Sequence, residues 1–325
     1  MSKTNTLYPL KFIPILKEKV WGGSKLYQVL DKNGVGKVGE SWEISDLENG
    51  TSVISNGTFK GQSLPSLISR YKAEFVGEKV YGQFGDTFPL LFKFIDAHED
   101  LSVQVHPGDK LAKKRHNSFG KTEIWYIVET EKDARLILGF NKEVDEKSYL
   151  KKLSEGNITD ILHSEKVKPG DTFFIAPGTV HAIGEGVLLA EIQQTSDITY
   201  RIYDWDRPDI NGNMRDLHTD LAKDAINFKN IEAKIEYQDI NNKTIPLKSL
   251  EYFETNKLNI TKDFTRNLAE IDSFIVYMCT QGEANIETEF ASETLKKGET
   301  VLIPACFSSI KIKSTSVTLL ETYIP

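Results

Sequence analysis

Hydrophobic and polar residues alternate in short runs that end at turns, a pattern typical of β-strands. The run at 101–108 reads LSVQVHPG, so five residues of strand-type alternation end at a Pro-Gly turn. Residues two apart in a strand point to the same face. Ser102, Gln104 and His106 therefore share one face of this predicted strand, while apolar residues fill the other.

The same reading predicts the other elements of the chain. Further strands are expected at 89–96, 121–127 and 170–181 and through most of the chain after residue 247. Helices are expected where apolar residues recur every three or four positions, at 63–84 (beginning near Pro65), 144–161 and 216–226. The polar, charged segment 229–247 is predicted to be a linker.

Two glycine-led segments repeat each other faintly. The sequence KPGDTFFIAP at 168–177 parallels KKGETVLIP at 296–304. The first copy continues to His181, whereas the second continues without a histidine, and no histidine follows His218. The repeat predicts a second β-domain that resembles the first and binds no metal.

Composition narrows the class of protein. The 325 residues are 27% charged and 39% hydrophobic, which suits a soluble globular protein, and the length favours two domains. The net charge of −7 argues against binding to nucleic acid or an anionic membrane, so an anionic substrate would need cationic residues gathered locally. Because neither a transmembrane run nor a signal peptide is visible, we expect a cytoplasmic protein. Cys279 and Cys306 are expected to be buried free thiols.

Four side chains at strands or turns form a candidate metal site. They are Gln104, His106, Glu123 and His181, which offer two imidazoles, a carboxylate and an amide oxygen. A lone histidine at a strand end is usually a surface residue, so the interpretation depends on the whole set. With one formal negative charge among its ligands, the site would keep net positive charge, which favours Lewis-acid use over a charge-neutral structural role. One zinc ion suits these donors, and manganese, iron or cobalt remain alternatives.

One lysine interrupts the apolar run at 89–96. A buried ammonium requires an anionic partner, so Lys93 predicts a charged group inside the fold. The alternative is an edge strand with Lys93 in solvent.

The order Q-x-H-P, then a glutamate, then a glycine-led strand ending P-G-x-x-H resembles the metal motifs of the cupin barrel. The glutamine in place of a first histidine is similar to type I mannose-6-phosphate isomerases. This resemblance implies a mainly β fold of two cupin-like jelly-roll barrels with a few inserted helices. It divides the chain into a catalytic, metal-binding domain at 1–235 and a β-domain without metal at 236–325.

The resemblance also implies roles for individual residues. Lys93 and Ser102 match positions that hold the substrate phosphate, and Trp21 lies in a Trp-Gly segment near the active-site mouth, with a packed structural indole as the alternative. The family carries a lysine, a glutamate, an aspartate and an arginine near the metal, in an order matched by Lys121, Glu191, Asp197 and Arg201. We expect Arg201 to serve the reacting end of the substrate. The alternative makes it a phosphate ligand or an ion-pair partner of Asp197 or Asp204.

The neighbours of the matched lysine depart from longer family members. Those members carry a histidine and a proline where this chain has Gly120 and Thr122, which indicates a short, bacterial-type form.

The reaction implied by the resemblance is interconversion of mannose 6-phosphate and fructose 6-phosphate through a cis-enediol. The base stays open among Glu191, Lys121 and a hydroxide held by the metal. The alternatives are a non-catalytic sugar-phosphate-binding cupin and another metal-cupin enzyme. The expected partner is a small sugar phosphate, and the expected state is a monomer or weak homo-oligomer.

Overall fold

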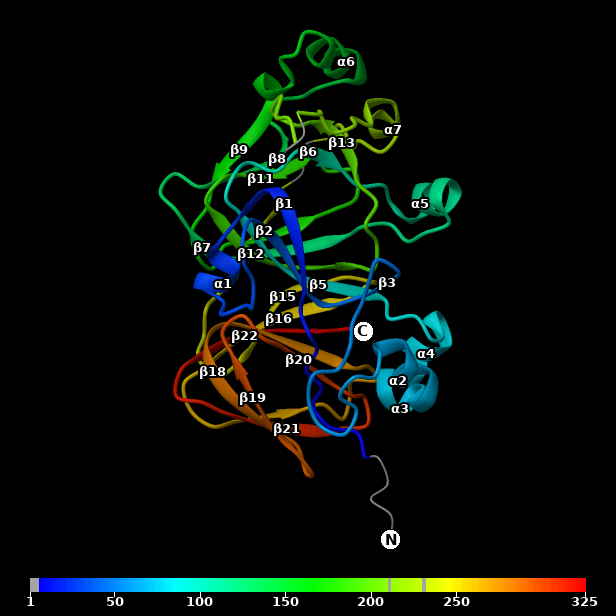
Figure 1. The fold of residues 1–325 in the computed structure, drawn as a ribbon, viewed down its shortest axis with the longest axis vertical. Coiled ribbons are helices and arrows are strands. Elements are labelled where there is room, and N and C mark those ends of the chain that lie inside the picture. Colours follow the sequence, from blue (N-terminus) through cyan, green and yellow to red (C-terminus); the bar gives the residue numbers. More distant parts are fainter. Residues whose placement is uncertain (1–5, 210–211, 230–231) are drawn as a thin grey trace.

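The computed structural model describes residues 6–209, 212–229 and 232–325, and the elements below lie in these ranges. Figure 1 shows two β-rich bodies stacked along the long axis, the upper one blue to green and the lower one mainly yellow to red. The predicted mainly β fold is therefore confirmed.

The upper body is a barrel made of two antiparallel sheets that face each other (Figure 1). The larger sheet has the order β1 (Ile15–Gly23), β2 (Val38–Ile44), β5 (Leu90–Ala97), β12 (Val187–Gln194), β7 (Glu123–Thr130), β10 (Thr172–Ile175), β14 (Lys234–Ile235). The smaller sheet has the order β13 (Tyr200–Tyr203), β6 (Val103–Val105), β11 (His181–Ile183), β8 (Arg135–Phe140), β9 (Leu162–Lys166). A short ribbon joins β3 (Asp46–Leu47) and β4 (Gly50–Thr51).

The lower body is a second antiparallel barrel. Its main path is β15 (Thr244–Ser249), β16 (Glu254–Ile260), β22 (Val317–Tyr323), β18 (Ile275–Glu287), β21 (Ser309–Lys313), β17 (Phe264–Asn267). The long strand β18 also pairs with β19 (Ser292–Lys296) and β20 (Thr300–Ile303). The strands β10 and β20 occupy the two copies of the sequence repeat and pair with β7 and β18 in the same way.

The helices are short and lie outside the barrels (Figure 1). They are α1 (Lys25–Gln28), α2 (Leu64–Tyr71), α3 (Ala73–Val76), α4 (Glu78–Phe84), α5 (Asp109–His116), α6 (Glu146–Ser154), the 3₁₀ helix η1 (Ile158–Ile161) and α7 (Thr219–Lys223). The single helix predicted at 63–84 is wrong, because the chain breaks at Lys72 and Gly77, where φ is +48° and +100°. A Cβ at Gly77 would collide with the backbone of Asp272 in the second barrel, so this turn requires glycine.

Three apolar clusters fix the first barrel. Side chains from both sheets, including Trp125, Leu136 and Phe173, fill its interior. A second cluster joins the outer face of the smaller sheet to α6, η1 and α7. The outer face of the larger sheet packs on α2–α4 and on the second barrel. The metal-site candidates therefore lie between two sheets that are each supported from outside.

The strand order shows where the chain passes from one barrel to the other, and the domain division at residues 235 and 236 stays a prediction. The last strand of the first barrel is β14, and the next strand, β15, belongs to the second. The N-terminal segment crosses this boundary, since Leu10 and Leu302 exchange backbone hydrogen bonds of 2.8 and 2.9 Å. The linker predicted at 229–247 is partly wrong, because both strands begin within it.

Two smaller expectations have mixed outcomes. Cys279 is a buried free thiol as predicted, but Cys306 is exposed, because it lies in the turn after β20 rather than in a strand. Within the described residues, no helix is long and apolar enough to cross a membrane.

Candidate functional site

Strand register brings the predicted ligands of the smaller sheet together. Gln104 in β6 lies directly opposite His181 in β11 and directly opposite Arg201 in β13. Directly opposed residues of antiparallel strands share a face, so these three side chains point into the barrel. His106 follows Gln104 by two residues and points the same way.

The opposite sheet supplies the carboxylate. Glu123 begins β7, and one ligand atom each from His106, Glu123 and His181 can be chosen so that all lie within 4.8 Å of one another. The Gln104 amide nitrogen lies 3.4 Å from Nε2 of His181, and an amide flip would place its oxygen there instead. The structure thus brings the four predicted ligands together.

Both imidazoles are prepared to act as ligands through Nε2. Nδ1 of His106 lies 2.8 Å from the carbonyl oxygen of Ile198, and Nδ1 of His181 lies 2.8 Å from that of Thr179. A carbonyl oxygen accepts, so each Nδ1 carries the hydrogen and each neutral ring presents a lone pair at Nε2. Burial lowers the pKa of His181 to about 4, and burial with the nearby Lys121 ammonium holds the pKa of His106 well below its usual range. Both rings are therefore neutral near pH 7.

The Glu123 carboxylate completes a set of donors that fits a divalent cation. It is fully buried; its Oε1 lies 2.8 Å from Nζ of Lys121, and its Oε2 has no partner among the described residues. Burial, with the neighbouring Glu191 carboxylate, raises the pKa of Glu123 to about 7. A bound cation would favour the ionised form and give Oε2 a partner. Two imidazoles, an amide and a carboxylate are ligands that zinc and similar metals accept.

Lys121 lies at this cluster, as its matched position implies. Its Nζ is 2.8 Å from Oε1 of Glu123 and 3.2 Å from Nε2 of His106. The Lys121 side chain is buried, so its charge acts on the cluster with little screening from solvent.

Lys93 has the buried anionic partner that the sequence predicted. Its Nζ is 2.8 Å from Oε2 of Glu191, and Glu191 lies directly opposite Lys93 on β12. The other carboxylate oxygen, Oε1, accepts a 2.9 Å hydrogen bond from the Trp125 indole. Burial disfavours the ammonium, but Glu191 and Glu40 outweigh this cost and raise the pKa of Lys93. The edge-strand alternative is wrong, because β5 lies between β2 and β12.

Glu40 is a site residue that sequence reasoning missed. It accepts a 2.6 Å hydrogen bond from the Trp42 indole and lies 3.1 Å from Nζ of Lys19. Burial opposes its charge, but Lys93 and Lys19 outweigh burial and lower the pKa of Glu40 to about 2. The alternation at 38–44 places Glu40 and Trp42 on one face, and this was the available signal.

Arg201 points into the barrel with donors to spare. Its Nη1 donates a 2.7 Å hydrogen bond to the Asp216 carbonyl oxygen, and its buried Nε has no partner among the described residues. The alternative pairing with Asp204 does not occur, since Asp204 binds Arg207 and Arg215 instead. The remaining donors of Arg201 are available to a ligand.

The other predicted residues lie at the edges of this arrangement. Ser102 is buried just before β6, and Trp21, 4% exposed, belongs to the same barrel-core cluster as Ile95 and Trp125. Asp197 accepts a 3.2 Å hydrogen bond from Asn49. Asp197 lies on the same loop as Ile198, whose carbonyl oxygen is the partner of His106. The contacts described place Trp21 and Asp197 near the site but not in the metal cluster.

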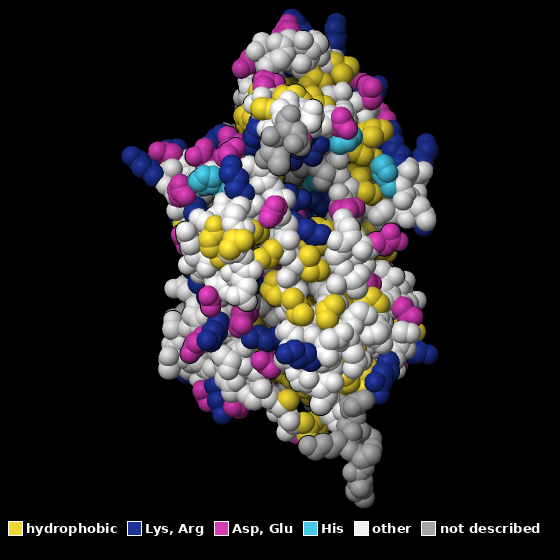
Figure 2. All heavy atoms as spheres, in the orientation of Figure 1, with side chains coloured by type: hydrophobic (Ala, Val, Ile, Leu, Met, Phe, Trp, Pro, Cys, Tyr) yellow, Lys and Arg dark blue, Asp and Glu magenta, His cyan; other side chains and the backbone are white. Residues whose placement is uncertain are grey.

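The molecular surface agrees with a site for an anion. Figure 2 shows a hollow in the upper half of the molecule, where lysine and arginine side chains gather. These cations collect despite the net charge of −7, as the sequence argument requires for an anionic substrate.

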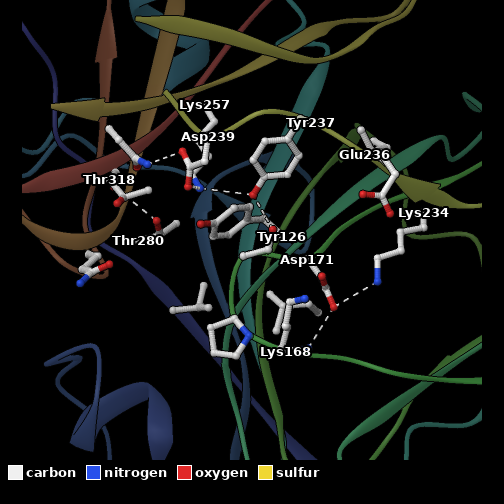
Figure 3. A pocket seen from close by; sticks show the side chains of 17 residues that line it. Tyr126, Lys168, Asp171, Lys234, Glu236, Tyr237, Asp239, Lys257, Thr280 and Thr318 are labelled. Atoms are coloured by element: carbon white, nitrogen blue, oxygen red, sulfur yellow. Dashed lines mark hydrogen bonds and ion pairs between the residues drawn. The ribbon is translucent and has the colours of Figure 1, made fainter. Parts of the chain in front are cut away.

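A different hollow, of about 420 Å³, lies between the two barrels (Figure 3). Its charged side chains largely pair with each other: Lys257 lies 2.8 Å from Asp239, and Lys234 lies 3.4 Å from Asp171. Tyr126 lines this hollow from the outer face of β7, whereas its neighbour Trp125 faces the barrel interior. The larger sheet therefore separates this hollow from the metal cluster.

Comparisons with known proteins agree with this geometry. The family model for the catalytic domain of type I phosphomannose isomerase matches residues 10–137, and that for the mannose-6-phosphate isomerase cupin domain matches residues 242–324. The chain is 36% identical to mannose-6-phosphate isomerase ManA of Bacillus subtilis, over 95% of this chain and 96% of that protein. It is 32% identical to mannose-6-phosphate isomerase of Streptococcus mutans, over 93% and 94% of the two chains.

Solved structures show the same architecture. The crystal structure of the mannose 6-phosphate isomerase from Bacillus subtilis superposes with a TM-score of 0.88 at 32% identity, covering 98% of this chain and 100% of that one. A mutant of phosphomannose isomerase from Salmonella typhimurium, 18% identical, shares the fold with a TM-score of 0.78 over 98% and 100% of the two chains. The expected cupin architecture is thus confirmed, and the chain belongs to the type I mannose-6-phosphate isomerase family.

Proposed function

We propose that this chain is a metal-dependent mannose-6-phosphate isomerase, which interconverts mannose 6-phosphate and fructose 6-phosphate. The observation that carries the proposal is the buried cluster of His106, Glu123 and His181, with ligand atoms within 4.8 Å of one another, in a chain of this family. The intact ligand set and the free donors of Arg201 favour an enzyme over a sugar-binding cupin without activity.

The reaction moves one proton between C1 and C2 of the sugar and shifts the carbonyl group between the same two carbons. A divalent cation, which we infer to be one zinc ion held by Gln104, His106, Glu123 and His181, would supply Lewis-acid stabilisation of negative charge at oxygen. We place the reaction on a cis-enediol path, because a single group on one face of the sugar can then remove and return the proton.

Three residues of the chain are assigned to the reacting end. Glu191 is the proton acceptor that we favour. Burial alone would raise its pKa, but Lys93 and Lys121 outweigh burial and lower the pKa, so the carboxylate is ionised near pH 7. Lys121, 2.8 Å from Glu123, is the alternative base or a donor to substrate oxygen. Arg201 would donate to oxygen as enediolate charge develops, through a planar group suited to two hydrogen bonds.

The phosphate end is assigned from the family match. Lys93 and Ser102 are proposed to hold the phosphate, as in the family they match, although Lys93 also neutralises Glu191. Trp21 and Asp197 stay predicted substrate-binding residues. We also keep the predictions of a cytoplasmic location and of a monomer or weak homo-oligomer.

A coupled assay tests the proposal. Purified protein should form fructose 6-phosphate from mannose 6-phosphate, lose this activity on dialysis against a chelator and regain it with zinc. His181→Ala should abolish both bound metal and turnover, whereas His163→Ala, at a side chain 49% exposed on β9, should change neither. Bound metal without isomerisation would favour a sugar-binding cupin, and turnover that survives complete metal removal would refute the metal dependence.

A further inference from the structure

We propose that Asp204 is a positioning residue that holds Arg201 in its working orientation through Arg215 and the backbone of Asp216. The inference rests on the proposed isomerase function, because it assigns Arg201 to the reacting end of that site. It concerns a carboxylate that follows β13 directly and has no assigned role in the reaction.

Asp204 is a buried anchor for two arginines. It is 4% exposed, and it accepts hydrogen bonds from Nε and Nη2 of Arg215 at 2.6 and 2.5 Å. Nη2 of Arg207 donates a third, at 3.0 Å. Two parallel hydrogen bonds from a guanidinium to a carboxylate fix both distance and orientation, so the position of Arg215 is set by Asp204.

The segment that begins at Arg215 holds Arg201 from two sides. The backbone N–H of His218 donates to the Arg201 carbonyl at 2.7 Å, and the Arg201 backbone N–H donates to Nδ1 of His218 at 3.1 Å. The Arg201 guanidinium donates to the carbonyl oxygen of Asp216 at 2.7 Å. Asp216 adjoins Arg215, so a shift of Arg215 would move the acceptor that aims the guanidinium.

The turn after Asp204 ties this arrangement to the metal-binding strand. Trp205 and Asp206 have φ of +59° and +50°, a conformation unusual for two residues other than glycine. The Trp205 indole donates a 2.7 Å hydrogen bond to the carbonyl of Leu101, just before the strand that carries Gln104. The turn is thus fixed relative to β6, the strand that carries Gln104. The unfavourable backbone conformation of Trp205 and Asp206 persists because the surrounding contacts determine it.

Charge gives Asp204 a second effect on the same residue. Arg215 and Arg207 both lie close enough to disfavour the charge of Arg201, and Asp204 offsets them. Asp204→Asn would keep the shape of the side chain, remove this compensation and weaken the paired hydrogen bonds from Arg215. The guanidinium of Arg201 would then be less well aimed, and only Asp216 would be left to offset the charges of Arg215 and Arg207.

A kinetic double-mutant cycle tests the inference with Asp204→Asn, Arg201→Ala and the double variant. Asp204→Asn alone should lower kcat by roughly 10- to 100-fold and change KM by less than about threefold, since misplacement by about 1 Å can cost about 10² in rate. In the Arg201→Ala background, Asp204→Asn should lower kcat by less than about twofold, because its target is gone. Equal losses in both backgrounds would overturn the proposal and make Asp204 a structural residue.

A matched variant separates alignment from stability. Glu321→Gln alters another buried, arginine-paired carboxylate, in the second barrel, and should lower the unfolding temperature while leaving kcat within about twofold of wild type. A loss of kcat in Glu321→Gln equal to that in Asp204→Asn would also overturn the inference. Wild-type turnover in the same assay tests the proposed function by itself, so the two ideas fail separately.

Discussion

The pair of Arg266 and Glu321 inside the second barrel allows a quantitative test of how this fold holds a buried charge. The Glu321 carboxylate is fully buried and accepts two hydrogen bonds from Arg266, each 2.9 Å long. The Tyr277 hydroxyl donates another at 2.6 Å, and the Asn256 amide donates one at 3.1 Å. Arg266 is thus the cation that neutralises a carboxylate with no access to water.

We expect Arg266→Met to be strongly destabilising, because it leaves the buried Glu321 carboxylate without its cationic partner. Removing one partner of a buried ion pair typically costs about 3–5 kcal/mol. If the two barrels unfold as one unit of a few hundred residues, at about 2–4 °C per kcal/mol, the unfolding temperature should fall by roughly 6–20 °C. The Arg266 side chain is 20% exposed, so water weakens the pair and the lower half of that range is expected.

Thermal unfolding followed by circular dichroism would measure this in Arg266→Met, Glu321→Gln and the double variant. The double variant should be more stable than Arg266→Met, because it removes the unpaired buried charge. The amide oxygen introduced by Glu321→Gln can still accept a hydrogen bond from the Tyr277 hydroxyl. That hydroxyl stays protonated, since burial and the Glu321 carboxylate raise its pKa well above the usual value. A fall below about 2 °C in Arg266→Met, or a double variant no more stable than it, would refute this account of the cluster.

Four further outcomes are expected around the first barrel. His106→Ala should lose its bound ion and turnover together, and turnover that survived loss of the ion in metal analysis would make the ion structural. Gln104→Glu should keep the ion but lower kcat, because a second carboxylate weakens its Lewis acidity; an unchanged kcat would remove that reason for a neutral ligand. Lys93→Met should raise KM through lost phosphate binding and also lower kcat, because Glu191 loses its ion pair, whereas a change in KM alone would limit Lys93 to the phosphate. Glu40→Gln should flatten the dependence of stability on pH in acid. The pKa of Glu40 is about 2 in the folded protein against an ordinary 4.5, so its charge stabilises the fold above pH 4.5 and this effect is lost as the pH falls toward 2. If the stability of variant and wild type changed in parallel with pH, this prediction would be contradicted.

The local sequence predicted those parts of the site that a single strand determines. Gln104 and His106 share a face because of strand geometry alone, and Lys93 required an anionic partner because an unpaired ammonium cannot be buried. That Glu123 and His181 would converge on the same point came from family resemblance. The structure supplies the reason in the register of β6 with β11, which no local pattern contains.

The features that sequence reasoning missed depend on contacts between distant segments. Glu40 joins the site because β2 pairs with β5, and Asp204 matters because Arg215 folds back beside β13. The predicted helix at 63–84 breaks at Gly77 because Asp272 of the second barrel approaches its backbone. In each case the deciding contact comes from a segment that is distant in the sequence.

The two barrels keep a buried glutamate at the same place, and the difference in its surroundings explains why only the first has a candidate metal cluster among the described residues. Glu191 in β12 lies opposite Lys93 and Trp125, and Glu321 in β22 lies opposite Asn256 and Tyr277. An aromatic donor binds each carboxylate: the Trp125 indole in the first barrel and the Tyr277 hydroxyl in the second. The cationic partner differs, however.

In the first barrel Lys93 neutralises Glu191 from the adjacent strand, which leaves the facing sheet free to present His106 and His181. In the second barrel Arg266 of β17 instead donates hydrogen bonds to Glu321. A guanidinium offers no lone pair, so the group that reaches Glu321 from β17 cannot act as a metal ligand in the way that the imidazoles of the first barrel can. Among the described residues, Arg266 thus neutralises the buried Glu321 carboxylate inside the second barrel. The absence of a metal from this barrel stays a prediction, which also rests on the lack of histidine after His218.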